Sequence, residues 1–217
     1  MEDFVARLRR LDCCSISDAL DRLGLSGQVT GLPQLSGKGR IAGRAVTVRL
    51  GTGKPPEGPP RHLGTTAIES GNADSVIVVE QRSGVEAGSW GGLLTLGALA
   101  RGIAGTISDG LVRDVDEAID LGYPVFARGT TCLTARGRVA EMETGGPITV
   151  GQVRVAPGDY VVADRSAVIF IPETSIAAVL EQAETIAAKE ATMAGAIRAG
   201  TPIGRVMGGD YEHMLKG

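Results

Sequence analysis

Strand-like and helix-like segments alternate between residues 75 and 127, and this alternation constrains the fold more than any other feature of the sequence. The run Val-Ile-Val-Val at residues 76–79 predicts a buried strand, and leucines at positions 93, 94, 96 and 99 predict a helix over residues 91–101. Further strands are predicted at residues 104–108 and 124–127, on either side of a helix at residues 112–121. Strands that alternate with helices of this length form βαβ units, so we expect an α/β fold with parallel strands.

Both flanks of this alternating region add further elements. Strands are predicted at residues 44–50, 139–143, 149–155, 160–163 and 168–171, and helices at residues 3–12, 17–23, 62–69 and 172–199. The Gly- and Pro-rich segments 26–43 and 51–60 are expected as loops. We therefore expect one domain over residues 1–217, with an N-terminal helical segment (1–25) and a C-terminal helical extension (172–217).

The composition excludes several classes of protein. A net charge of -3 and an aromatic content of 3% predict no nucleic-acid partner, because neither a basic field nor stacking surfaces are present. His62 and His213 are the only histidines, which argues against a metal site built from several histidines. Cys13, Cys14 and Cys132 have no spacing typical of a disulfide framework or a zinc site, so we expect reduced thiols and a cytoplasmic location. No long apolar run is present, so we expect no membrane partner.

The sequence also lacks the glycine-rich loops that bind nucleotides. Neither a GxGxxG motif between a strand and a helix nor a GxxxxGK[ST] motif is present. The run Gly-Thr-Gly-Lys at residues 51–54 is followed by prolines, which would block the helix that a phosphate-binding loop needs. An enzyme that uses a nucleotide or S-adenosylmethionine is therefore disfavoured.

A glycine pair, Gly91-Gly92, opens the helix that is predicted at residues 91–101. The first amides of a helix have no acceptor within it, so the amides of Leu93 and Leu94 would point at any negative group in front of them. A glycine pair alone is more often only a turn.

The segment Asp-Gly-Leu-Val-Arg-Asp follows at the carboxyl end of the next predicted strand, the edge where open α/β sheets bind ligands. Arg113 offers a planar fork for a carboxylate, and Asp114 offers an oxygen ligand for a hard cation. Asp114 is also a favourable charge at a helix start, and Asp116, Glu117 and Asp120 are expected on a solvated helix face. Free amides, a guanidinium and a metal-binding carboxylate around one point would together suit a 2-oxo acid.

Several motifs of this chain resemble the RraA-like superfamily. They are Trp90-Gly91-Gly92-Leu93-Leu94, Ala100-Arg101-Gly102-Ile103-Ala104-Gly105-Thr106, Asp109-Gly110-Leu111-Val112-Arg113-Asp114-Val115-Asp116-Glu117, Leu121-Gly122-Tyr123-Pro124-Val125-Phe126-Ala127, Ile16-Ser17-Asp18-Ala19-Leu20 and Pro157-Gly158-Asp159-Tyr160-Val161-Val162-Ala163-Asp164. The resemblance covers most of residues 15–215. The superfamily includes the 4-hydroxy-4-methyl-2-oxoglutarate and 4-carboxy-4-hydroxy-2-oxoadipate aldolases, and also the regulator of ribonuclease E activity.

The resemblance implies a swivelling β/β/α domain in a homotrimer or homohexamer, with active sites between subunits. It implies Mg²⁺ or Mn²⁺ as the cofactor, with Asp114 as the residue that anchors the metal. Arg113 would hold the pyruvoyl oxygens of a small 2-oxo acid and stabilise the enolate, and the amides of Leu93 and Leu94 would hold the carboxylate. Asp18 matches a position at which a neighbouring subunit contributes an acid.

One position departs from the aldolase pattern. The aldolases usually carry an acid directly before the two leucine-type amides, where this chain has Gly92. Retro-aldol cleavage needs a base, whereas β-decarboxylation mainly needs an electron sink. Four residues are candidates for a replacement base: Asp18 across an interface, Asp109, Glu86 and Glu190.

We therefore expect a divalent-metal-dependent carbon–carbon lyase that forms a pyruvate enolate by retro-aldol cleavage, by oxaloacetate decarboxylation, or by both. The alternative is a non-catalytic regulator of ribonuclease activity. The intact Arg113-Asp114 pair and the long C-terminal helix favour the lyase, and the missing glycine-rich cofactor loop argues against a demethylmenaquinone methyltransferase. The C-terminal helix is expected to pack on a neighbouring subunit through Ile176, Val179, Leu180, Ala183 and Ile186, although this stripe would equally suit its own domain.

Overall fold

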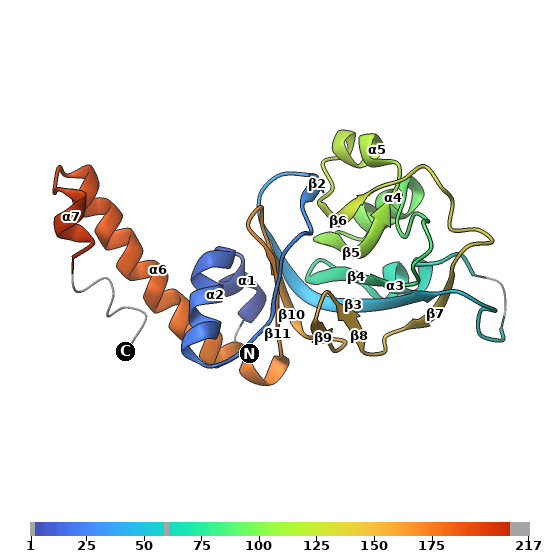
Figure 1. The fold of residues 1–217 in the computed structure, drawn as a ribbon, viewed down its shortest axis with the longest axis horizontal. Helices are drawn as coiled ribbons and strands as arrows, with labels where there is room; N and C mark the ends of the chain where they lie inside the picture. Colours follow the sequence, from blue (N-terminus) through green and yellow to red (C-terminus); the bar gives the residue numbers. More distant parts are fainter. Residues whose placement is uncertain (1–2, 59–60, 209–217) are drawn as a thin grey trace.

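The structure is a computed structural model that describes residues 3–58 and 61–208. Its helices are α1 (Phe4–Leu8), α2 (Cys13–Arg22), α3 (Thr65–Ser70), α4 (Gly92–Ala100), α5 (Val115–Asp120), α6 (Ile176–Arg198) and α7 (Ile203–Val206), with a 3-10 turn at Glu173–Ser175 (Figure 1). Its strands are β1 (Gln28–Val29), β2 (Gln34–Ser36), β3 (Ile41–Gly51), β4 (Ser75–Gln81), β5 (Gly105–Val112), β6 (Val125–Thr130), β7 (Ala140–Thr144), β8 (Ile148–Val150), β9 (Val153–Val155), β10 (Tyr160–Ala163) and β11 (Val168–Ile171). The α/β class is confirmed.

In the described residues, one nine-stranded sheet runs in the order β1-β11-β10-β3-β4-β5-β6-β2, and β7 pairs with the second half of β3. Strands β3, β4, β5 and β6 are parallel neighbours, as the alternating segments predict. The flanking strands join antiparallel to this centre. The carboxyl ends of β4 and β5 therefore lie side by side, and the loops that follow them meet at the same edge.

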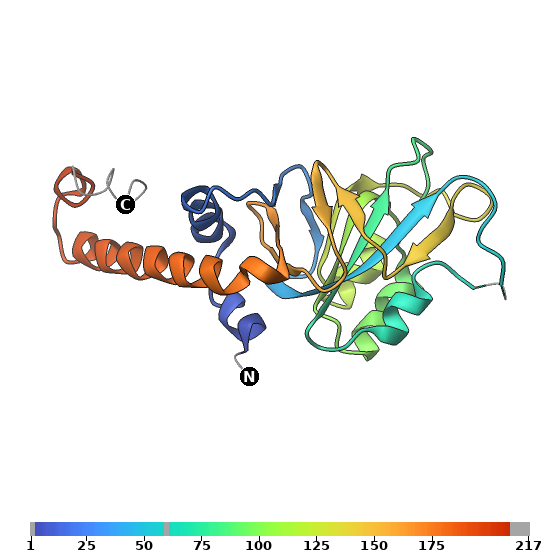
Figure 2. The same ribbon diagram turned by 90° about the horizontal axis from the view of Figure 1, so that it is seen from below.

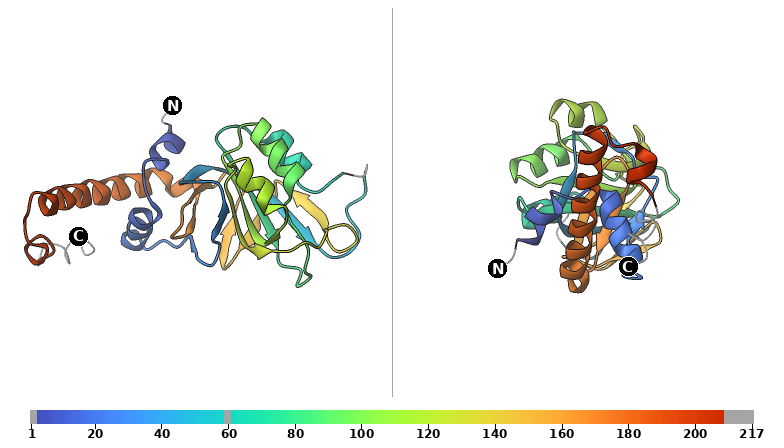
Figure 3. Two further views of the ribbon diagram at one scale, coloured as in Figure 1. Left: turned by 90° about the horizontal axis from the view of Figure 1, so that it is seen from above. Right: turned by 90° about the vertical axis from the view of Figure 1, so that its left-hand side faces the viewer.

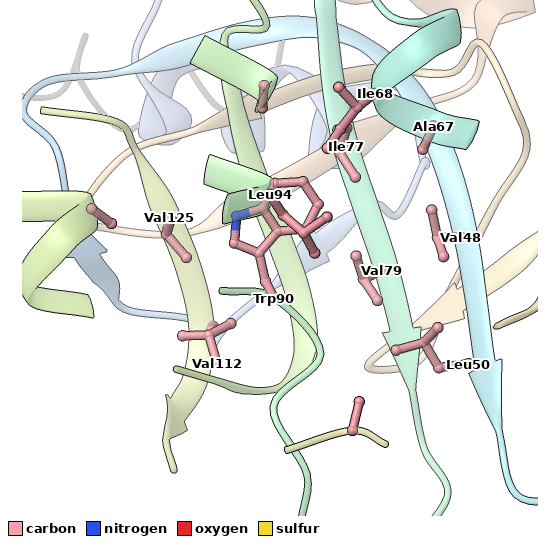
Figure 4. Packing of buried hydrophobic residues seen from close by; sticks show 14 of the residues in the cluster. Val48, Leu50, Ala67, Ile68, Ile77, Val79, Trp90, Leu94, Val112 and Val125 are labelled. Carbon is pink, nitrogen blue, oxygen red and sulfur yellow. The ribbon is translucent and has the colours of Figure 1, made fainter. Parts of the chain in front are cut away.

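The long strand β3 divides the core because its alternate side chains point to opposite faces of the sheet. Val48 and Leu50 belong to a buried cluster with residues of α3 and α4, in which Trp90 lies among Leu94, Val79 and Val112 (Figure 4). Ile41 and Ala45 of β3 belong instead to a cluster on the other face that includes residues of the hairpin β8–β9. The result is a hairpin layer, a sheet and a helical layer, in agreement with the expected β/β/α arrangement.

Helices α1, α2 and α6 cover the end of the sheet that β10 and β11 form. The stripe on α6 (Ile176, Val179, Leu180, Ala183 and Ile186) is buried here within the same chain, so its predicted docking on a neighbouring subunit is wrong. Beyond the stripe, α6 projects from the sheet as an arm with α7 at its end, as Figures 2 and 3 show. Ile197 and Ile203 on this arm are exposed. None of the helices in residues 3–58 and 61–208 combines the length and apolar character needed to cross a membrane.

Several predicted boundaries need correction. The strand expected at residues 149–155 is the hairpin β8–β9, because Gly151 turns the chain at a φ of 59°. The first two helices begin at Phe4 and Cys13 rather than at residues 3 and 17. The side chain of Asp12 caps α2, because its Oδ1 accepts a hydrogen bond from the Ser15 amide at 2.8 Å. Segment 26–43 contains β1, β2 and the start of β3. In the C-terminal extension, residues 209–217 and His213 lie outside the described residues. The assignment of residues 1–217 to one domain stays a prediction.

Candidate active site

The first half of the candidate site is the start of α4. Gly91 precedes the helix in an extended conformation, and Gly92 is its first residue. The amides of Leu93 and Leu94 come too early in the helix to find an acceptor within it, and no acceptor for them lies in the described part of the chain. A helix start with unpaired amides attracts anions, as the sequence predicts.

The second half is the segment that follows β5. Strand β5 continues to Val112, farther than predicted, so Arg113 and Asp114 follow its end directly and α5 begins only at Val115. The Arg113 amide donates to the Trp90 carbonyl at 3.0 Å, which ties this segment to the start of α4. Asp114 has a φ of 56° and is the only non-glycine residue with a positive φ among the described residues. Such conformations persist where the surrounding structure holds them, and they cluster at functional sites.

The Asp114 carboxylate joins the two halves. One oxygen, Oδ2, accepts a hydrogen bond from the Gly92 amide at 3.0 Å, and the other, Oδ1, accepts from Nε of Arg113 at 3.2 Å. The Arg113 and Asp114 side chains are 37% and 31% exposed, so both remain accessible to a ligand. The structure thus brings together Arg113, Asp114 and the free amides, as the sequence predicts.

Glycines before α4 leave the room that these charged side chains occupy. A Cβ atom on Gly88 would lie 2.9 Å from Cγ of Arg113, and a Cβ atom on Gly91 would lie 2.8 Å from Oδ2 of Asp114. Separations under 3.0 Å are not tolerated, so a side chain at either position would displace the charged group. The glycines therefore have a role in the geometry of the site beyond forming a turn.

Glu117 fills the corresponding space at Gly92. A Cβ atom on Gly92 would overlap the Glu117 carboxylate, with Cδ only 2.7 Å away. Glu117 is predicted on a solvated helix face. Its side chain is exposed, but its carboxylate packs against the first residue of α4. The signal that could have revealed this is the spacing of three between Asp114 at the N-cap and Glu117, which puts both on the same side of the helix start.

The site opens into a pocket of about 400 Å³. Its wall includes residues Arg61, His62, Gly88, Trp90, Gly91, Gly92, Leu93, Leu94, Arg113, Asp114, Thr134, Arg136 and Glu141, among others. The sequence motifs assign no role in the site to Arg61, His62, Arg136 or Glu141. The Glu141 carboxylate is fixed at the wall, because one oxygen accepts from the Gly64 amide at 2.6 Å and the other from the Thr144 hydroxyl at 2.6 Å.

Buried hydrogen bonds make the site rigid. The Ser89 hydroxyl lies 2.6 Å from the Ser108 hydroxyl and donates to the Leu111 carbonyl at 2.8 Å, which holds the loop before α4 against β5. Trp90 is 2% exposed, and its indole Nε1 donates to the Thr95 hydroxyl at 2.9 Å. Trp90 therefore packs in the core at the wall of the pocket.

The other predicted acids lie away from this pocket. Asp18 on α2 and Glu190 on α6 belong to the helical end of the molecule (Figure 1). Burial, followed by the negative charge of Asp21, raises the pKa of Asp18, and burial together with the charges of Asp12 and Asp18 raises the pKa of Glu190. The Asp18 carboxylate therefore acts on Glu190, and neither residue lines the pocket of its own chain.

Asp114 is the carboxylate that could bind a metal ion in this pocket. The described residues contain no group of three or more His, Cys, Asp or Glu side chains that could hold a metal ion. A site with one protein carboxylate does not suit zinc, which takes three or four protein ligands. It does suit Mg²⁺, which keeps several waters and commonly takes one or two carboxylates together with oxygens of the substrate.

The chain is similar to known proteins of one family. The profile of the RraA-like family, described as Aldolase/RraA, matches residues 13–170. A protein of Halalkalibacterium halodurans named "Putative 4-hydroxy-4-methyl-2-oxoglutarate aldolase" is 30% identical over 183 residues, which cover 84% of this chain and 82% of the relative. Protein DlpA of Legionella pneumophila is 30% identical over 203 residues, 94% of this chain, but the chain spans only 33% of that relative's length. The solved structure of an uncharacterized protein from Pseudomonas syringae pv. tomato has a TM-score of 0.83 and 30% identity, over 94% of this chain and 96% of that one.

Proposed function

The chain belongs to the RraA-like family, and from this premise we propose that it is a carbon–carbon lyase that acts on small 2-oxo acids through a pyruvate enolate. The reaction is retro-aldol cleavage of a 4-hydroxy-2-oxo acid, decarboxylation of oxaloacetate, or both. The observation that carries the proposal is that the free amides of Leu93 and Leu94, the Arg113 guanidinium and the Asp114 carboxylate meet in one pocket. The similarity to a relative named for 4-hydroxy-4-methyl-2-oxoglutarate aldolase supports the same class.

These groups match the charges of the substrate and of the enolate. The carboxylate of a 2-oxo acid would accept hydrogen bonds from the Leu93 and Leu94 amides at the positive end of α4. The Arg113 guanidinium would donate to the oxygen on C2, where negative charge develops as the enolate forms. Because Arg113 and Asp114 are held by the backbone contact to Trp90 and by the Gly92 amide, little reorganisation is needed when that charge appears.

The proposal includes Mg²⁺ or Mn²⁺ at Asp114. When bound, the ion would act as a Lewis acid that stabilises negative charge on the substrate oxygens. Asp114 would be its protein ligand, and the Gly92 amide and Arg113 would orient that carboxylate.

We also propose that the protein forms a homo-oligomer, either a trimer or a hexamer. Leu93, Leu96 and Leu99 on α4 are 86%, 52% and 40% exposed, and Ile119 on α5 is 52% exposed. Apolar side chains grouped in this way favour contact with another subunit. In such an assembly the acids at the helical end of one subunit could approach the pocket of another, which is the arrangement expected for Asp18. Light scattering of the purified protein would test the assembly, and a monomer would contradict it.

A non-catalytic regulator of ribonuclease activity is the second candidate, because the family is described by both an aldolase and RraA. The exposed leucines of α4 would also suit a protein partner. The two candidates make different demands on Arg113 and Asp114. A lyase needs both side chains oriented inside the pocket, as they are here, whereas a surface that only binds a protein does not. Pyruvate release from oxaloacetate or from 4-hydroxy-4-methyl-2-oxoglutarate in the presence of Mg²⁺ supports the lyase, and its absence with both substrates contradicts it.

A further inference from the structure

Retro-aldol cleavage would require a proton acceptor near the pocket, and most carboxylates there are already engaged. Both oxygens of Glu141 accept short hydrogen bonds within the wall. Both oxygens of Asp114 also accept hydrogen bonds, and this residue is assigned to the metal. These two groups are therefore poor choices for holding a water molecule that must accept a proton.

Two other candidate bases, Asp109 and Glu86, are also engaged in hydrogen bonds within the same subunit. Asp109 is 8% exposed and forms a structural ion pair, with Oδ1 accepting from Nε of Arg128 at 2.7 Å and Oδ2 accepting from the Gly151 amide at 2.9 Å. Glu86 is exposed, and its carboxylate is engaged because it accepts from the Thr131 hydroxyl at 2.7 Å. Neither residue is placed to serve the substrate.

Glu117 differs from all of these. Its carboxylate packs against Gly92, which lines the pocket. Within the part of the chain that the structure describes, it takes part in no hydrogen bond or ion pair. Glycine at position 92 is what makes this placement feasible, because any side chain there would overlap the carboxylate. An unengaged carboxylate, supplied by α5 rather than by α4, thus lies against a residue of the pocket wall at the start of α4.

We propose that Glu117 is a positioning residue of this site, which holds the water that accepts the substrate proton in retro-aldol cleavage. This inference rests on the proposed lyase function and deepens it. The substrate hydroxyl on C4 gives its proton to the water, which passes a proton to the Glu117 carboxylate. The C3–C4 bond breaks, its electron pair becomes the C2=C3 bond of the enolate, and the C4 oxygen becomes a carbonyl. The same proton then returns through the water to C3 and gives pyruvate, so no other reactant is needed.

Decarboxylation of oxaloacetate separates this role from the rest of the site. In that reaction the carbon–carboxylate bond breaks and its electron pair forms the enolate directly, without removal of a hydroxyl proton. Arg113 is needed in both reactions because both form the enolate, whereas Glu117 is needed only in retro-aldol cleavage. A purely structural Glu117, acting as a favourable charge at the α4 N-terminus, would affect both reactions together through stability.

The test compares Glu117→Gln with a matched control, Asp116→Asn, which removes a neighbouring exposed acid on the same helix. For Glu117→Gln we expect kcat for retro-aldol cleavage of 4-hydroxy-4-methyl-2-oxoglutarate to fall about 100-fold or more, while oxaloacetate decarboxylation changes less than about 3-fold. Asp116→Asn should match the wild type in both reactions. Glu117→Asp should recover part of the retro-aldol rate, because it keeps the carboxylate. Mn²⁺ affinity by calorimetry and the Tm should match the wild type in Glu117→Gln, since the residue is not a metal ligand.

The outcomes separate the two levels of inference. An unchanged ratio of the two reactions in Glu117→Gln overturns the role of Glu117 and leaves the lyase proposal intact. Equal losses in both reactions with a lowered Tm overturn it in favour of a structural role. A retro-aldol loss in Glu190→Gln or Asp18→Asn, with none in Glu117→Gln, assigns the water to a neighbouring subunit and also overturns it. A wild-type protein that releases no pyruvate from either substrate overturns both inferences.

Discussion

Replacement of Gly91 by alanine tests the geometry of the site without removing any charged group. The added Cβ atom would lie 2.8 Å from Oδ2 of Asp114 and 3.2 Å from Cγ of Arg113, whereas ordinary contact begins at 3.4 Å. The Asp114 oxygen would therefore have to move by about 0.6 Å. The backbone itself is not strained by the change, because Gly91 is extended, with a φ of -158° and a ψ of -177°.

A misplacement of about 1 Å in a catalytic group can reduce the rate about 100-fold, so a shift of this size should lower kcat/KM by about 10- to 100-fold, or about 1.4–2.7 kcal/mol. Pyruvate release from oxaloacetate with Mg²⁺ is the assay, and the Tm shows whether the variant is folded. Gly92→Ala is the matched control, because its Cβ atom meets the flexible Glu117 side chain instead and alanine favours the helix. It should keep decarboxylation near the wild-type rate. A folded Gly91→Ala protein with wild-type kcat/KM and wild-type Mn²⁺ affinity would refute this reading of the glycines.

Three further changes test other parts of the structure. Arg113→Ala should abolish pyruvate formation without a change in hydrodynamic size, and wild-type turnover would remove Arg113 from the site. Leu180→Ala should lower the free energy of unfolding in urea by about 2–5 kcal/mol, because Leu180 is fully buried. Ile197 is 40% exposed, so Ile197→Ala should lower it by less than about 0.5 kcal/mol. Equal losses in the two variants would contradict the placement of α6. Burial raises the pKa of Asp164, but hydrogen bonds from the Cys13 amide and other backbone amides outweigh it and the pKa is lowered. The stability that the Asp164 carboxylate contributes should therefore be complete above about pH 4 and lost as the pH falls through the lowered pKa. Asp164→Asn should accordingly be less stable than the wild type at pH 7 and closer to it near pH 2. An equal difference in the free energy of unfolding at both pH values would contradict this.

The parallel centre of the sheet and the paired halves of the site could be predicted from the sequence because their signals are local. The apolar run in β4 and the Arg113-Asp114 pair after β5 are each recognisable within a few residues. The topology then brings them together, since loops after neighbouring parallel strands share one edge.

Other features depend on pairings that no short segment shows. Glu141 and Arg136 reach the pocket because β7 pairs with the distant end of β3. The sequence predicts one strand where the hairpin β8–β9 lies, because a single glycine, Gly151, is a weaker turn signal than a pair such as Asn-Gly. The stripe on α6 predicts a buried face, but not whether its own chain or another covers it. The position of the Glu117 carboxylate could not be predicted from the sequence, because it depends on the space that Gly92 leaves at the start of α4.

The measurement that tests the central claim most directly is pyruvate release from oxaloacetate and from 4-hydroxy-4-methyl-2-oxoglutarate, with Mg²⁺, with EDTA, and with the Asp114→Ala variant. The account predicts release that Mg²⁺ supports, that EDTA removes and added Mg²⁺ restores, and that Asp114→Ala loses while the protein stays folded. Release that persists in EDTA or in the folded Asp114→Ala variant would contradict the assignment of the metal to Asp114, and no release from either substrate would contradict the lyase itself.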